Sequence, residues 1–146
     1  MVRKGKKWTN AKEVIYEGIK FGSNLELTMY KLLKEAKIKF NYIGAERAKY
    51  TLLEDSTFEG KCYERSQKRS KEMKDTPKIL GTGYTPDFAA KDESWFIEVK
   101  GRKLGDFGIR WKLFKRKLNE RDPTPDLYMP TSKVDCEQVV KILNNK

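Results

Sequence analysis

The sequence predicts a single α/β domain in which helices flank a central mixed β-sheet, and three observations support this. The chain has 146 residues, 38% of them hydrophobic, which is enough for one modest core. Three stretches carry apolar residues at helical spacing. Shorter stretches alternate apolar and polar residues, as strands do. We therefore expect the order helix, strand, insertion, two strands, helix, strand and helix.

Residues 1–22 are expected to form a basic N-terminal arm and residues 23–146 the folded domain. Residues 1–12 carry five Lys and Arg and no acid, with little periodicity. The first helix is expected after Ser23, because Ser23 and Glu26 have the spacing of a capping box. Five residues at helical spacing form its apolar face: Leu25, Met29, Leu32, Leu33 and Ala36.

A strand at residues 38–42 precedes a basic insertion at about residues 54–80. Residues 61–78 hold seven Lys and Arg against three acids and few apolar side chains, so we expect a solvated, mobile segment. Cys62 and Cys136 lie far apart and outside any C-x-x-C pair. They are predicted to be reduced thiols rather than a disulfide or a metal site.

Residues 81–101 are predicted to form a β-hairpin with its turn at 91–94. Its second strand alternates, with one face formed by Trp95, Ile97 and Val99 and the other by Phe96, Glu98 and Lys100. A helix at about 106–121 follows, with the apolar stripe Phe107, Trp111, Phe114 and Leu118. A short strand at 127–129 and a helix capped by Ser132 complete the expected fold.

The composition limits the possible functions. The net charge of +11 predicts a polyanionic partner, either nucleic acid or an anionic membrane surface. The chain has no histidine, which excludes histidine bases, Ser-His-Asp and Cys-His pairs, and zinc sites that need imidazole. No apolar run could span a bilayer and no signal-peptide pattern occurs, so we expect a cytoplasmic protein without a membrane partner.

The strongest chemical signal is Pro86-Asp87 followed by Glu98-Val99-Lys100. On a strand, Glu98 and Lys100 face the same way, and the paired strand can bring Asp87 beside them. Two converging carboxylates suit Mg²⁺, which keeps several water ligands and accepts phosphate oxygens. The alternative is that Glu98 and Lys100 form an ordinary surface ion pair.

These residues resemble the motif of the PD-(D/E)xK nuclease superfamily, most closely the endonuclease I family of phage Holliday-junction resolvases. The similarity covers residues 23–42 and 83–101 and includes Ser23-x-Leu25-Glu26, residues 84–88 and Glu98-x-Lys100-Gly101. The resemblance implies a restriction-endonuclease-like core. It also implies Mg²⁺ as cofactor, with Mn²⁺ substituting, and cleavage of branched or junction DNA in phage DNA metabolism.

The resemblance also implies residue roles. Glu26, Asp87, Glu98 and Lys100 correspond to the catalytic residues, and the metal ligands would be Asp87, Glu98, the carbonyl of Val99, and Glu26. Glu26 has an alternative role as the capping residue of its helix. The basic insertion enlarges a segment that is short in the resolvases, where it bridges two subunits, so both a monomer and a homodimer stay open.

Basic residues in three clusters, and two that follow the catalytic strand, are the expected DNA contacts. They are Arg3, Lys4, Lys6, Lys7, Lys68, Arg69, Lys71, Arg102, Lys103, Arg110, Lys112, Lys115 and Arg116. Two other functions remain open: a nicking or genome-degrading phage endonuclease without junction specificity, and a non-catalytic nucleic-acid-binding protein of the same fold.

Overall fold

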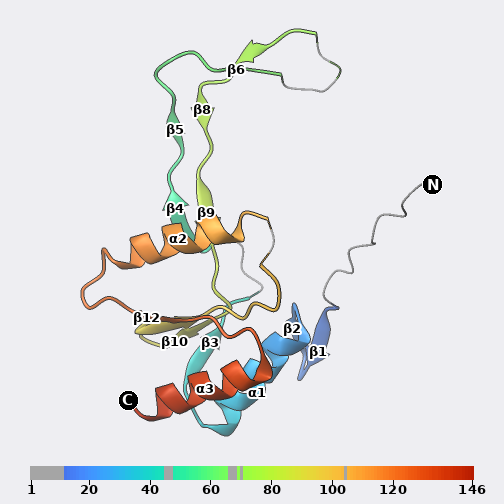
Figure 1. The fold of residues 1–146 in the computed structure, drawn as a ribbon, viewed down its shortest axis with the longest axis vertical. Helices are drawn as coiled ribbons and strands as arrows, with labels where there is room; N and C mark the ends of the chain where they lie inside the picture. The colour runs from blue at the N-terminus through green and yellow to red at the C-terminus, as the bar shows by residue number, and fades with distance from the viewer. Residues whose placement is uncertain (1–11, 45–47, 66–68, 70, 104) are drawn as a thin grey trace, which may run out of the picture.

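A four-stranded mixed sheet lies at the centre of the fold (Figure 1). The computed structural model describes residues 12–44, 48–65, 69, 71–103 and 105–146. The strand order is β12–β11–β10–β3, with bounds Asp126–Tyr128, Trp95–Ile97, Phe88–Ala90 and Phe40–Tyr42. β12 runs parallel to β11, and the other two pairings are antiparallel. The expected mixed sheet is confirmed.

Three helices cover the two faces of this sheet within the described residues. Helices α1 (Asn24–Glu35) and α3 (Lys133–Asn144) pack together on one face, and α2 (Phe107–Leu118) covers the other (Figure 1). The parallel pairing of β11 with β12 requires a crossover connection, which α2 supplies. The prediction of a mixed sheet flanked by helices is therefore confirmed, and all three helices lie where the periodicity predicted them.

The residues of β11 and their continuation point alternately to the two faces, as predicted. Trp95, Ile97 and Val99 belong to the core cluster beneath α1 and α3. Phe96 belongs to the other cluster, where its ring lies 5.6 Å from that of Phe114 in α2. The backbone continues this pattern past the strand, because the N–H of Glu98 donates to the Tyr128 carbonyl at 2.9 Å. Glu98 and Lys100 therefore lie on the α2 side of the sheet.

The described part of the expected N-terminal arm is folded. Strands β1 (Val14–Tyr16) and β2 (Ile19–Phe21) form an antiparallel hairpin. Phe21 has no exposed surface and packs against the rings of Tyr30 and Tyr42, at 5.0 and 4.8 Å. The part of the expected arm at residues 14–21 is therefore paired and packed. The sequence does not signal it, because two three-residue strands are too short to give a strong period-two pattern.

The expected insertion forms a long antiparallel ribbon that projects from the body (Figure 1). It is built from three successive pairs: β4 (Tyr50–Leu53) with β9 (Thr82–Tyr84), β5 (Ser56–Thr57) with β8 (Lys78–Ile79), and β6 (Tyr63–Glu64) with β7 (Lys74–Asp75). The described residues between 54 and 80 are mostly exposed, as expected of a solvated segment, and the two short pairs β5–β8 and β6–β7 lie among them.

The ribbon corrects the predicted hairpin over residues 81–101. Of the predicted first strand of this hairpin, only β10 pairs with β11, whereas residues 82–84 pair with β4. Pro86 separates the two segments and has no N–H to donate to a ladder, so the chain changes partner there. Cys62 and Cys136 are both free, as predicted. Among the described residues, no helix is long and apolar enough to cross a membrane.

Candidate active site

Asp87 and Glu98 lie opposite each other at one end of the β10–β11 pair. The register pairs Phe88 with Ile97, and one further step brings Asp87 opposite Glu98. The Asp87 carboxylate accepts the backbone N–H of Val99 at 2.7 Å. This bond fixes the Asp87 side chain across the strand pair, so the sheet brings together the two carboxylates predicted from the sequence.

Glu98 is a buried carboxylate with an unused oxygen. The residue is 5% exposed, and its Oε1 lies 3.5 Å from the Lys100 ammonium. Its Oε2 is buried without a hydrogen-bond partner. Burial raises the pKa of Glu98, and the neighbouring Tyr84 and Lys100 offset this in part. A buried acceptor without a partner costs about 1–3 kcal/mol, so this oxygen is suited to binding a cation.

Asp87 is in a similarly unfavourable environment for a negative charge. Burial raises the pKa of Asp87 well above its usual value, and the charges of Glu98 and Glu26 raise it further. The Val99 N–H and the Lys100 charge act in the opposite direction but do not cancel the effect. Two carboxylates that disfavour each other's ionisation are a common feature of metal and catalytic sites.

Lys100 is held between the carboxylates and helix α2. Its backbone N–H donates to the Pro130 carbonyl at 3.0 Å, and its ammonium lies 4.5 Å from the centre of the Phe107 ring. The side chain is 30% exposed, so it contacts both Glu98 and solvent. The structure therefore brings Lys100 into the predicted group.

Glu26 caps its helix and also acts on Asp87. Ser23 accepts the Glu26 N–H at 3.2 Å, which confirms the predicted N-cap. The Glu26 carboxylate accepts bonds from the Tyr42 hydroxyl at 2.8 Å and the Gly22 N–H at 3.2 Å. The carboxylate is thus engaged at the helix start, and its negative charge also contributes to the raised pKa of Asp87.

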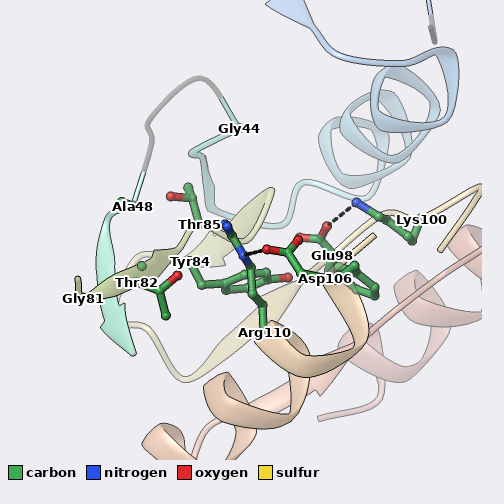
Figure 2. Close-up of a pocket in the computed structure, with 12 residues that line it drawn as sticks. Gly44, Ala48, Gly81, Thr82, Tyr84, Thr85, Glu98, Lys100, Asp106 and Arg110 are labelled. Atoms are coloured by element: carbon green, nitrogen blue, oxygen red, sulfur yellow. Dashed lines mark hydrogen bonds and ion pairs between the residues drawn. The ribbon is translucent and has the colours of Figure 1, made fainter. Parts of the chain in front are cut away.

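A pocket of about 530 Å³ opens beside these residues on the α2 side of the sheet (Figure 2). Glu98, Lys100, Tyr84 and Arg110 line it, together with the loop at Gly44. Tyr84 is 6% exposed, and its hydroxyl is buried without a hydrogen-bond partner. Burial raises the pKa of Tyr84, and the neighbouring Glu98 carboxylate raises it further, so the Tyr84 hydroxyl stays protonated beside Glu98.

Tyr84 was not predicted as a site residue, although it lies in the motif segment 84–88. Its position depends on the pairing of β9 with β4, two strands that the rest of the ribbon separates along the chain. It also depends on packing against Phe114, whose ring centre lies 4.7 Å from that of Tyr84. No local pattern in the chain could have predicted this placement. Arg110 was predicted only as one of several basic residues, and the structure places it at the pocket.

The donor set fits Mg²⁺ held by few protein ligands. Within the described residues, no group of three or more acidic or cysteine side chains is gathered closely enough to hold a metal ion. Asp87 and the unused oxygen of Glu98 nevertheless form a pair of carboxylates, and Mg²⁺ is commonly held by one or two carboxylates with waters and phosphate oxygens. The Glu26 carboxylate is already engaged by Tyr42 and Gly22, and the Val99 carbonyl stays a predicted ligand.

The predicted DNA contacts fall into three groups. Arg110 lines the pocket, where its Nε bonds Asp106 at 2.8 Å. Seven others are exposed, on the loop after Lys100, on α2 and near the ribbon tip: Arg102, Lys103, Lys112, Lys115, Arg116, Arg69 and Lys71. Five lie outside the described residues: Arg3, Lys4, Lys6, Lys7 and Lys68.

One family model, described as "Protein of unknown function (DUF1064)", matches residues 6–127 of the chain. The chain belongs to the DUF1064 family. No curated protein and no solved structure matches it. The DUF1064 match contains α1, the ribbon, β10, β11 and α2, so all four candidate catalytic residues lie within it, whereas α3 follows it.

Proposed function

We propose that this DUF1064 protein is a Mg²⁺-dependent DNA endonuclease with a PD-(D/E)xK core. The observation that carries the proposal is the buried Glu98 carboxylate with its unused oxygen, opposite Asp87 and in contact with Lys100. A protein that only bound DNA would gain nothing from a buried acid and a half-buried one beside a phosphate, because they repel it. The same two acids are useful when a divalent cation lies between them and the phosphate.

Each candidate residue has a task that its environment supports. Asp87 and Glu98 hold the cation, and the bond from Val99 keeps Asp87 oriented. Bound Mg²⁺ supplies positive charge that stabilises the transition state and makes hydroxide available near neutral pH. Lys100, kept in place by Glu98 and Phe107, binds the scissile phosphate or orients the attacking water. Glu26 acts as a positioning residue, through its helix cap and its charge.

Junction or otherwise branched DNA is the preferred substrate in this proposal. The ribbon gives the basic residues near its tip, such as Arg69 and Lys71, a reach well beyond the body (Figure 1). A branched substrate offers a second arm for such a projection, whereas a single duplex does not. Nicking or degradation of plain duplex DNA by the same chemistry is the second candidate, since the catalytic residues alone do not select a substrate.

The experiment compares four-way junctions, linear duplex and supercoiled plasmid incubated with the protein and Mg²⁺, Mn²⁺ or EDTA. Preferential cutting of the junction supports resolution, and equal nicking of all substrates supports the second candidate. DNA binding without cutting in either metal supports the non-catalytic alternative and contradicts the proposal. Sedimentation of the protein alone decides between a monomer and a homodimer, and so tests whether two strands of a junction can be cut by one assembly.

A further inference from the structure

The N-terminus of helix α2 forms part of the wall of the pocket beside Glu98. Asp106, Phe107 and Arg110 all line the pocket, and α2 begins at Phe107. Asp106 occupies the N-cap position but makes no side-chain capping bond, and the first turn contains no acid. The first backbone N–H groups of a helix lack partners within it and carry a partial positive charge. The Asp106 carboxylate at this end is bonded to Arg110 and does not cap the helix, so this end of α2 is suited to a bound anion.

Positive side chains are gathered at this helix end, where acidic ones are normally favoured. Lys100 lies over the ring of Phe107, and Arg110 is one turn further along α2. Figure 2 shows Arg110 and Asp106 on one side of Glu98 and Lys100 on the other, with Tyr84 beside them. In the free protein Arg110 is paired with Asp106 and Lys100 with Glu98, and both cations lie at the positive end of the helix, where a bound anion is favourable.

Two buried groups without partners line the same pocket. The Tyr84 hydroxyl and Glu98 Oε2 are both buried and unbonded, in residues that are 6% and 5% exposed. Buried polar groups are nearly always hydrogen-bonded, so two in one pocket indicate that a ligand completes the site. The hydroxyl can donate to the neighbouring Glu98 carboxylate, whose pKa Tyr84 lowers, or to a bound anion, whereas the carboxylate oxygen can also accept a cation.

We propose that this pocket binds a phosphodiester group of the DNA strand, held by the first N–H groups of α2, the Tyr84 hydroxyl and Arg110. This assignment rests on the proposed nuclease function for the identity of the ligand, and it deepens that function by naming the residues that hold the phosphate. Arg110 is paired with Asp106 in the free protein, and it exchanges this partner for the phosphate when DNA binds. The phosphate lies close to Lys100 and to the cation held by Glu98.

The test measures DNA affinity by fluorescence anisotropy with Ca²⁺ in place of Mg²⁺, so that no cutting is needed. Arg110→Gln and Tyr84→Phe are each expected to weaken binding by about tenfold, the effect typical of removing a hydrogen bond to a charged group. Tyr84→Phe keeps the ring that packs against Phe114, so the variant is expected to fold, and its melting temperature is measured beside its affinity. Weaker binding with unchanged stability supports a contact with DNA, and an unchanged affinity for both variants overturns the proposal.

Asp106→Asn is expected to change the DNA affinity in the opposite direction. It frees Arg110 and removes a negative charge from the pocket mouth, so we expect tighter binding. Glu120→Gln is the matched control, because it breaks the ion pair between Glu120 and Lys117 at the far end of the same helix. Equal tightening by both variants would mean that net charge alone matters, which contradicts a phosphate site at the N-terminus of α2.

Methylphosphonate substitution tests the ligand directly, by replacing one DNA phosphate at a time with a neutral group. One position should weaken binding in wild type and have a smaller effect in Arg110→Gln, because the two changes remove the same contact. A 5′-mononucleotide serves as a second ligand. If Arg110→Gln weakened the binding of the mononucleotide but not that of DNA, the assignment to a DNA strand would be overturned. If wild type cuts DNA but no position behaves in this way, the phosphate site fails and the nuclease function stands. If wild type binds DNA in this way but never cuts it, the phosphate site stands and the nuclease function fails.

Discussion

At the scale of single residues, the energetics of Asp87 and Glu98 distinguish this site from a surface ion pair. An exposed ion pair contributes about 0–1 kcal/mol and leaves both partners solvated. Here burial raises the pKa of both carboxylates, and one oxygen of Glu98 stays unpartnered. The protein therefore loses stability by keeping these acids, which is typical of residues retained for function.

Asp87→Asn is expected to stabilise the metal-free protein, and more strongly as the pH rises. The pKa of Asp87 is raised in the folded state, so the folded protein binds that proton more tightly than the unfolded chain. Ionisation of Asp87 lowers the stability of the folded protein. This loss is absent below pH 3.8, the usual pKa of the group, and grows as the pH rises towards the raised pKa. We expect a gain in unfolding free energy at pH 8 and little change near pH 4.

Urea unfolding at the two pH values, without metal, measures this difference. Asn can still accept the Val99 N–H, so the hydrogen bond is kept and only the charge is removed. Glu137→Gln, at an exposed position of α3, is the control for the loss of one carboxylate. An equal effect of Asp87→Asn at both pH values would contradict the raised pKa.

At the scale of elements, two helix caps provide a matched pair of variants. Ser23 and Ser132 both accept the backbone N–H three residues on, at 3.2 Å in each case. We expect Ser23→Ala and Ser132→Ala each to lower the unfolding free energy by about 0.5–2 kcal/mol. Only Ser23→Ala also removes a bond to the Glu26 carboxylate, so only it should reduce the cleavage rate under conditions where both variants are folded. Equal cleavage by the two variants would exclude a positioning role for this cap.

The ribbon is expected to be dispensable for folding and important for binding. Beyond Leu52 and before Tyr84, its described residues do not belong to the core clusters. Replacing residues 57–78 with an Asn-Gly turn should change the unfolding free energy by less than about 1 kcal/mol while it weakens DNA binding. The slope of log affinity against log salt should become shallower by about 0.9 for each phosphate that the ribbon neutralises in the wild type. An unchanged slope would mean that the ribbon does not contact DNA.

The sequence predicted the elements whose signal is local. The helices after Ser23 and Ser132 have side-chain caps, and residues 95–100 alternate strictly, so their positions follow from neighbouring residues. The β1–β2 hairpin was not predicted because its strands are short, and the ribbon was not predicted because its paired strands lie far apart along the chain. The change of partner at Pro86 was missed because it depends on the ribbon.

At the scale of the whole molecule, the sequence predicted which acids and lysine meet but not what surrounds them. The approach of Asp87 to Glu98 follows from one strand pair, and the structure shows that pair. The pocket requires β9, α2 and the end of β11 to come together, and no local pattern encodes this arrangement. The proposed roles of Tyr84 and Arg110 could therefore be assigned only from the structure.

The measurement that tests the account most directly is single-turnover cleavage of a four-way junction by wild type, Glu98→Gln and Glu137→Gln in Mg²⁺. We expect wild type and Glu137→Gln to cut at the same rate. Glu98→Gln removes the buried charge that faces the pocket, so we expect it to lower the rate by about a hundredfold or more while it still binds the junction. Cleavage by Glu98→Gln at the wild-type rate, or no cleavage of any DNA by wild type, would contradict the account.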